Sequence, residues 1–381
     1  MRFWILLVWF CLVGDAVLHA QVQDVTALSQ QAAAFESAHD YSNAEQAWRQ
    51  VVQIAPDNAD ANAHLGLVES LQGKYKQAIP AYEKALKLHP AYPGLEMNLA
   101  LAYFKAGELN GAIAPLKEAA KEAPSDMRPK ILLGMSYYGT GKYAEAVPYL
   151  RASVEQSPTN LQLRLTLAQS CLWATDYPCA LEQYRAILQQ DPNSAQADMI
   201  AGEALDGTGD VIGAIAQFEA AEKAAPNMPN VHFGLGYLLW KQGHFDTAKT
   251  EFQKELAINP KNGEAATYLG DIEMKDNEDV SARSHLELAK QQPAVDKLTF
   301  LDLGILDARA GKNPEAKAEF EHVIAIAPKE PDAHWRLARL LQAMGRKDEA
   351  AKELETVRQL HVDKDQQPLQ QITRPQTPTQ P

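Results

Sequence analysis

One alanine recurs at a constant interval along most of this 381-residue chain. The members of this alanine column are Ala44, Ala78, Ala112, Ala146, Ala180, Ala214, Ala248, Ala282, Ala316 and Ala350. A strict period of this length indicates a repeat array in which every copy is one supersecondary unit. Such an array grows by stacking copies against their neighbours, so the chain needs no single large core.

Other residues keep the same period. A glycine or alanine stands at a constant offset before each alanine of the column, as Gly66 precedes Ala78, and a large apolar residue such as Tyr82 stands one helical turn after it. Proline usually follows the alanine at a constant offset, from Pro56 to Pro328. Glycine or asparagine stands shortly before most of the alanines, where a positive φ lets a helix end and the chain reverse. Each copy is therefore predicted to be a helix, a tight turn and a second helix, which pack closest at the small residues.

These columns resemble the tetratricopeptide repeat, a helix–turn–helix unit with the same period. The resemblance implies an all-α fold, an α-solenoid wound as a right-handed superhelix, with the first helix of each repeat on the concave side. It covers residues 25–362. The predicted repeats are about 25–58, 59–92, 93–126, 127–160, 161–194, 195–228, 229–262, 263–296, 297–330 and 331–362.

The two ends of the chain differ from the repeats. Residues 1–20 combine Arg2, an unbroken apolar run from Phe3 to Val13, and Ala20 before a cleavage point. This pattern is typical of a secretory signal peptide of bacterial type and is too short for a membrane span. It predicts an exported protein, periplasmic or extracellular, with no membrane span after cleavage; a retained N-terminal anchor is the alternative. Residues 363–381 are rich in proline and glutamine and are predicted to be a disordered tail.

Cys171 and Cys179 are the only cysteines outside the predicted signal peptide. Cys171 falls late in the first helix of its repeat and Cys179 early in the second, so the hairpin turn brings the two residues side by side. In an exported protein such a pair suggests a disulfide. Two buried thiols that fill core positions remain the other interpretation.

No catalytic motif is found in the sequence. The chain has no Walker-type glycine loop, no His-Glu-x-x-His and no Gly-x-Ser-x-Gly. Its histidines form no pair at the spacing of one helical turn, so neither a metal site nor a cofactor is predicted. The net charge of −13 argues against nucleic acid as a partner. We therefore expect no enzymatic activity.

A partner is expected to bind the concave groove that the family resemblance implies. Exposed apolar and aromatic side chains offer binding area without fixed geometry. The candidate groove residues are Leu101, Phe104, Met135, Tyr138, Leu172, Trp173, Met199, Phe233, Tyr237, Trp240 and Trp335. The alternative for each of them is packing between neighbouring repeats.

Some family members grip an acidic peptide terminus with Lys, Asn and Arg. The matching places here are Ala63, Met97, Ile131, Leu165, Met199 and Phe233. An apolar grip is therefore expected in place of a carboxylate clamp.

The sequence thus predicts a non-enzymatic scaffold that binds a protein or peptide in the cell envelope or outside the cell. The alternative is an accessory protein of polysaccharide synthesis or export, or of glycosyl transfer, because aromatic side chains also suit sugar faces. An enzyme of unrecognised kind is a third and weaker hypothesis, because a solenoid alone supplies no preorganised site. The oligomeric state and the identity of the partner are not predicted.

Overall fold

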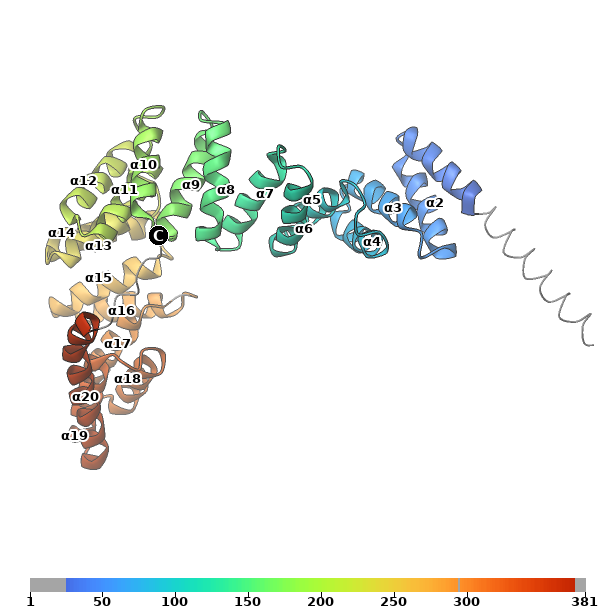
Figure 1. The fold of residues 1–381 in the computed structure, drawn as a ribbon. Helices are drawn as coiled ribbons and strands as arrows, with labels where there is room; N and C mark the ends of the chain where they lie inside the picture. Colours follow the sequence, from blue (N-terminus) through green and yellow to red (C-terminus); the bar gives the residue numbers. More distant parts are fainter. Residues whose placement is uncertain (1–24, 294, 374–381) are drawn as a thin grey trace, which may run out of the picture. The chain divides into compact units, whose positions relative to one another are not determined.

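The computed structural model of the chain describes residues 25–293 and 295–373, with side chains up to residue 360 (Figure 1). All regular structure in this part of the chain is α-helical, as predicted. None of the described helices is both long enough and apolar enough to cross a bilayer. The predicted signal peptide, residues 1–20, lies outside the described residues.

Two compact parts make up the chain, Met1–Pro192 and Asn193–Pro381. The N-terminal part starts with a helix over residues 25–37. It continues with α2 (Tyr41–Ile54), α3 (Ala59–Leu71), α4 (Tyr75–Leu88), α5 (Leu95–Lys105), α6 (Leu109–Glu122), α7 (Arg128–Gly139), α8 (Tyr143–Gln156), α9 (Leu161–Trp173) and α10 (Tyr177–Leu188).

The C-terminal part repeats the same alternation of helices. It contains α11 (Ala195–Thr208), α12 (Val211–Ala224), α13 (Val231–Lys241), α14 (Phe245–Ile258), α15 (Gly263–Lys275), α16 (Asp279–Lys290), α17 (Lys297–Arg309), α18 (Asn313–Ile326), α19 (Pro331–Ala343) and α20 (Lys347–Thr373).

The odd-numbered helices from α3 onward are the first helices of their repeats (A helices), and the even-numbered ones are the second (B helices). Each A helix packs against the B helix that follows it, and each B helix packs against the next A helix within its part. Successive A helices also touch, for example α3 with α5 and α13 with α15. No comparable contact joins two successive B helices among the described residues. Within each part the A helices therefore form the inner layer.

The repeated small residues lie where the two helices of a repeat approach most closely, as the sequence predicts. Every alanine of the column is at most 1% exposed. A Cβ atom added to Gly304 would lie 2.5 Å from the ring of Phe320, and one added to Gly66 would lie 2.7 Å from the ring of Tyr82. The large residue after the alanine thus packs flat on the small residue of the partner helix, which joins the hairpin tightly.

A residue with positive φ stands at every predicted turn between an A helix and its B helix. Most of these residues are the expected glycines, and Asn277 has φ +63°. His39 and Thr175 also take this conformation, each with φ +58°. Their two repeats lack the glycine or asparagine of the turn, so the period of the fold imposes the left-handed conformation on other residues there, and the β-branched Thr175 disfavours it most.

The C-terminal helix is longer than predicted. Residues 363–373 belong to α20, which runs to Thr373, whereas the sequence predicted a disordered tail from residue 363. No glycine or proline stands between Val362 and Gln367 to stop the helix at the expected boundary, and lysine and glutamine are good helix formers. The helix also includes Pro368, which propensity alone does not explain. The rest of the predicted tail, residues 374–381, lies outside the described residues.

Candidate functional site

An aromatic cluster lies on the A helices of the C-terminal part. It consists of Phe233, Tyr237 and Trp240 of α13 and Tyr268 of α15, and we call it the aromatic face. The first three residues are spaced by four and three, so they share one side of α13. The ring of Tyr268 meets Trp240 edge-on at 4.8 Å and Tyr237 at 5.4 Å between centroids. All four side chains are partly buried, so each keeps some open surface.

Trp240 is held in place by a buried carboxylate. Its indole Nε1 donates a hydrogen bond to Oδ2 of Asp271, 2.6 Å away. Lys275 donates to the same oxygen at 2.5 Å, and its ammonium stands 5.3 Å from the centre of the Trp240 ring. A hydrogen bond and a cation–π contact therefore fix the indole before any partner arrives, which lowers the entropic cost of binding.

Asp302 of α17 is a buried acid in the same part of the chain. One of its carboxylate oxygens has no hydrogen-bond partner among the described residues. The pKa of Asp302 is raised to about 8, mainly by burial and also by the charge of Asp271, while Lys275 and Arg336 oppose the shift. Asp302 is therefore largely protonated at neutral pH. Burial also raises the pKa of Tyr268.

A smaller aromatic cluster lies in the N-terminal part. Tyr138 of α7 stacks on Trp173 of α9 at 5.9 Å, and Tyr143 of α8 lies 4.7 Å from the same indole. The hydroxyl of Tyr138 donates to the side-chain oxygen of Gln169 at 2.7 Å. Trp173 itself is exposed.

The candidate groove residues divide into three groups. Leu101, Trp173 and Trp335 are exposed. The partly buried ones are Phe104, Met135, Tyr138, Met199, Phe233, Tyr237 and Trp240. Leu172 is buried and offers no surface to a partner. Met199 packs against the core between its own repeat and the next, as the alternative interpretation holds.

Tyr143 and Tyr268 were not predicted. Tyr143 begins a B helix. Tyr268 stands in a column whose other members, such as Gly234 and Asp302, gave no sign of an exposed aromatic residue.

The two cysteines are joined in the structure. Cys171 lies in the last turn of α9 and Cys179 in the first turn of α10, and their sulfur atoms are bonded at 2.01 Å. Both residues are buried, and Nη2 of Arg151 lies 3.1 Å from the sulfur of Cys179. The bridge closes the hairpin of the fifth repeat across the turn at Thr175.

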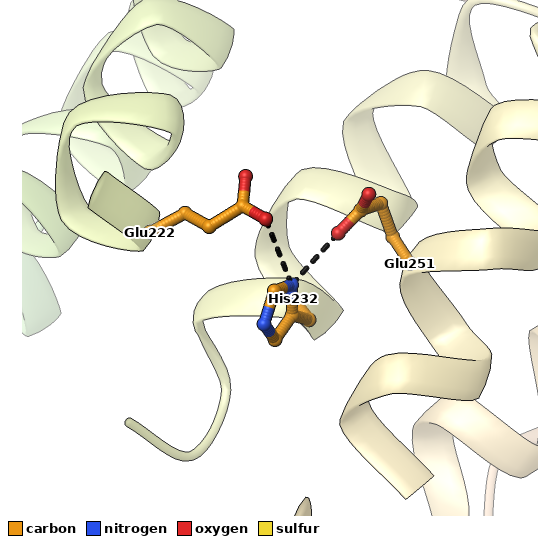
Figure 2. A group of neighbouring side chains, drawn as sticks. All are labelled: Glu222, His232 and Glu251. Carbon is orange, nitrogen blue, oxygen red and sulfur yellow. Dashed lines mark hydrogen bonds and ion pairs between the residues drawn. The ribbon is translucent and has the colours of Figure 1, made fainter. Parts of the chain in front are cut away.

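A histidine and two carboxylates meet where α12, α13 and α14 come together (Figure 2). Nδ1 of His232 lies 2.7 Å from Glu251 and 3.8 Å from Glu222. One ligand atom from each residue lies within 4.8 Å of the other two. No metal site was predicted, because no two histidines stand one helical turn apart in the sequence. The three residues of this cluster come from three helices and are far apart along the chain.

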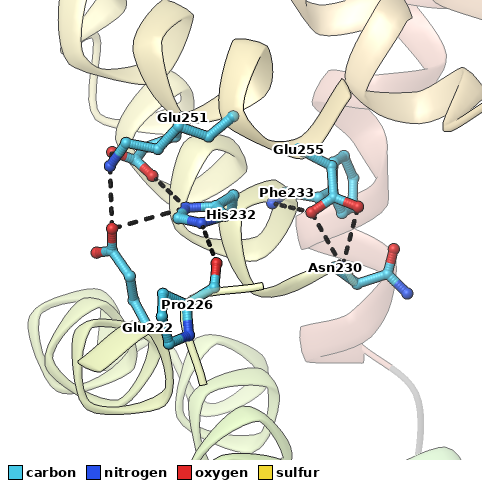
Figure 3. A network of polar contacts seen from close by, with 8 residues as sticks. Glu222, Pro226, Asn230, His232, Phe233, Glu251 and Glu255 are labelled. Atoms are coloured by element: carbon cyan, nitrogen blue, oxygen red, sulfur yellow. Dashed lines mark hydrogen bonds and ion pairs between the residues drawn. The ribbon is translucent and has the colours of Figure 1, made fainter. Parts of the chain in front are cut away.

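The same junction holds a wider polar network (Figure 3). Nε2 of His232 donates to the backbone oxygen of Pro226 at 2.9 Å. On the other side, Glu255 of α14 accepts hydrogen bonds from the backbone of Asn230 and Phe233 at the start of α13. Helix α14 thus fixes the first turn of the helix that carries the aromatic face.

Comparisons with known proteins agree with this repeat architecture. A tetratricopeptide repeat family model matches residues 70–134, 137–203 and 308–371, and a second tetratricopeptide repeat model matches residues 29–93 and 233–296. Among curated proteins, anaphase-promoting complex subunit 3 of Schizosaccharomyces pombe is 28% identical over 123 residues. That match spans 32% of this chain and only 18% of the relative.

Similarity to solved structures is found at low sequence identity. The crystal structure of the APC/C hetero-tetramer Cut9-Hcn1 gives a TM-score of 0.51 at 12% identity, over 92% of this chain and 85% of that chain. The Pseudomonas aeruginosa pilF structure gives a TM-score of 0.49 at 22% identity, over 54% of this chain and 94% of that chain. The repeat columns, the helix pairs and the matched family model together place this chain in the tetratricopeptide repeat family.

Proposed function

We propose that the protein is a non-enzymatic scaffold that binds a protein or peptide partner through the A-helix layer, with the aromatic face as the main contact. One observation carries the proposal: Trp240 is partly open and already oriented by Asp271 and Lys275. A tryptophan fixed in this way resembles the residues that dominate protein–protein interfaces, where large aromatic side chains supply most of the binding energy.

The kind of partner follows from the chemistry of the aromatic face. Its rings offer apolar contact, and the carboxylates and lysine beside them offer a few polar contacts. An extended peptide with apolar or aromatic side chains suits such a surface. Proteins of this family are generally protein–protein interaction scaffolds, and the proteins similar to this chain include subunits of multiprotein assemblies.

The test uses peptides selected from a random display library against the full chain, with affinities measured by calorimetry. We expect Tyr237→Ala and Trp240→Ala each to weaken binding about 10-fold or more. The matched control is Ile212→Ala on the B helix α12, where Ile212 is 84% exposed, and it should leave affinity unchanged. Circular dichroism checks that all variants remain folded.

Two results would overturn the proposal. Equal loss of affinity in the Ile212 and Trp240 variants would show that the peptides bind nonspecifically to exposed apolar side chains. Binding of a polysaccharide, with no peptide selected at all, would favour the accessory role in polysaccharide synthesis or export.

We also propose that the protein works outside the cytosol, in the periplasm or beyond the cell. The signal-like residues 1–20 and the bond between Cys171 and Cys179 support this, because disulfides persist mainly in oxidising compartments. Mass spectrometry of the protein from fractionated cells, alkylated without reduction, tests it. The expected product begins at Gln21 and carries no alkylated cysteine. An intact Met1 together with two alkylated cysteines would contradict the proposal.

A further inference from the structure

The cluster of Glu222, His232 and Glu251 has the ligand types of a metal site. Glu222 comes from α12, His232 from α13 and Glu251 from α14, so three successive helices each contribute one side chain (Figure 2). His232 and Glu251 are buried, and Glu222 is partly buried. One imidazole nitrogen and two carboxylate oxygens are ligands that zinc accepts, and three protein ligands leave a fourth position for water.

The orientation of His232 is fixed by its other ring nitrogen. Nε2 lies 2.9 Å from the carbonyl oxygen of Pro226, and a carbonyl can only accept, so Nε2 carries a proton. Nδ1 is therefore the nitrogen that faces the two carboxylates (Figure 3). Histidines that bind metals usually donate their second N–H to a carbonyl or carboxylate in this way.

A second copy of this arrangement in the chain shows which feature is unusual. His334 repeats the geometry three periods later, with Nδ1 2.6 Å from Glu353 and Nε2 3.0 Å from the oxygen of Pro328. The histidine, the glutamate and the proline carbonyl thus form a contact that the fold uses more than once. The place of Glu222 is taken there by Ile324, so only the His232 cluster has the third ligand.

In the structure the ammonium group of Lys254 bridges the two carboxylates of this cluster. Nζ of Lys254 lies 2.9 Å from Glu222 and 2.9 Å from Glu251. The side chain of Lys254 is 43% exposed, so its ammonium group can leave the two carboxylates and be hydrated by solvent. A divalent cation would then meet two carboxylates that already converge, with no change in the backbone.

We propose that Glu222, His232 and Glu251 bind a zinc ion that joins α12, α13 and α14. Zinc takes the place of the proton that joins Nδ1 to Glu251, which is released to water, and displaces the Lys254 ammonium from the two carboxylates. Metal–ligand distances of about 2.0–2.2 Å in a tetrahedral site require ligand atoms about 3.3 Å apart. The present 2.7 Å and 3.8 Å distances around Nδ1 bracket that spacing, and the three ligand atoms all lie within 4.8 Å of one another, so small shifts of the side chains are needed.

The experiment uses tag-free full-length protein, stripped with a chelator and titrated with zinc against a chromophoric competitor. We expect one zinc per chain, and Glu222→Ile, which copies Ile324, should weaken binding at least about 10-fold. Lys254→Met, which keeps the apolar stem, should tighten binding. His334→Ala is the matched control and should leave the affinity unchanged, since that copy lacks a third ligand.

Cobalt supplies a second readout that does not depend on stability. Intense visible absorption bands of four- or five-coordinate cobalt should form with the native chain and be absent with Glu222→Ile. Unchanged zinc affinity in Glu222→Ile, or equal losses in the His334→Ala control, would overturn the proposal. Either result would leave His232 as a structural contact of the kind that His334 makes.

Discussion

Both carboxylate oxygens of Glu255 lie 3.0 Å from the backbone nitrogen of Asn230. Asn230 precedes α13 with φ +70°, and its side chain makes no capping hydrogen bond to that helix. Glu255 is fully buried and takes over the role of the cap. Its negative charge also faces the positive end of the helix dipole.

Removal of Glu255 should therefore destabilise the C-terminal part. We expect Glu255→Ala to cost about 2–4 kcal/mol, since buried backbone donors at the start of α13 lose their acceptor, and Glu255→Gln to cost less. Thermal unfolding followed by circular dichroism measures the effect. Alanine already occupies the equivalent places Ala221 and Ala289. A neutral Glu255→Ala variant would show that alanine serves equally well here and that the cap is unimportant.

Asp302 predicts a pH dependence of stability. Its pKa is about 8 in the folded chain, against about 3.9 for an aspartate in an unfolded chain. Between these values the folded chain holds a proton that the unfolded chain has lost, so this contribution falls as pH rises from about 4 to about 8. The neutral side chain in Asp302→Asn should remove this loss and make the variant more stable than the native chain at pH 8.5, by on the order of 2 kcal/mol.

Denaturant unfolding at a series of pH values between 5 and 9 gives the comparison for Asp302. The stability difference between Asp302→Asn and the native chain should grow as the pH rises to about 8 and level off above that. Parallel curves would mean that Asp302 ionises normally, and that burial does not hold its proton.

The contact between Gly304 and Phe320 predicts a compensating pair of substitutions. Gly304→Ala places a methyl group 2.5 Å from the Phe320 ring and should cost about 1–3 kcal/mol through overpacking. Phe320→Leu in the same chain should recover most of that loss, because Ala100 with Leu116 is a natural pair at the equivalent places. A double-mutant cycle from thermal unfolding measures the coupling. Additive losses would show that the two side chains do not share the space between their helices.

Thr175 predicts a stabilising substitution. It stands at φ +58°, a conformation that a β-branched residue disfavours and that glycine accepts. Thr175→Gly should therefore raise the stability of the N-terminal part by about 0.5–1 kcal/mol, after the larger entropy of an unfolded glycine is subtracted. Asn277→Gly is the control and should change less, because asparagine tolerates this region. A lower melting temperature for Thr175→Gly would contradict the expectation.

The repeat period explains how much of the fold was predictable. Each column has one member in every repeat, so a single exceptional residue does not obscure the pattern. The helix pairs, the closest approach at the alanine column and most turns were predicted for this reason. The turn at Thr175 was expected from the period, but its positive φ was not, because Thr175, like His39, departs from the glycine rule of the turn. The extension of α20 was not predicted, because the interpretation of residues 363–381 rested on their proline and glutamine content and not on the helix propensity of the first of them.

The polar clusters could not be predicted in the same way. Glu222 and Glu255 stand in columns whose other members are often apolar, for example Ile324 and Ala289, and the column of His232 holds residues of every kind. Their meeting depends on how three successive helices pack, and no fixed spacing in the sequence expresses it. The aromatic face was partly foreseen, since Phe233, Tyr237 and Trp240 share one side of a single predicted helix. Tyr268 comes from the next repeat and appeared only with the structure.

The central claim is that a partner binds the A-helix layer at the aromatic face. A photoreactive amino acid placed at Tyr237, and in a second protein at Ile212 on α12, tests it with a labelled peptide selected against the native chain. We predict a covalent adduct from position 237 that is lost on competition with unlabelled peptide, and none from position 212. Equal adducts at both positions, or an adduct at position 212 alone, would contradict the account.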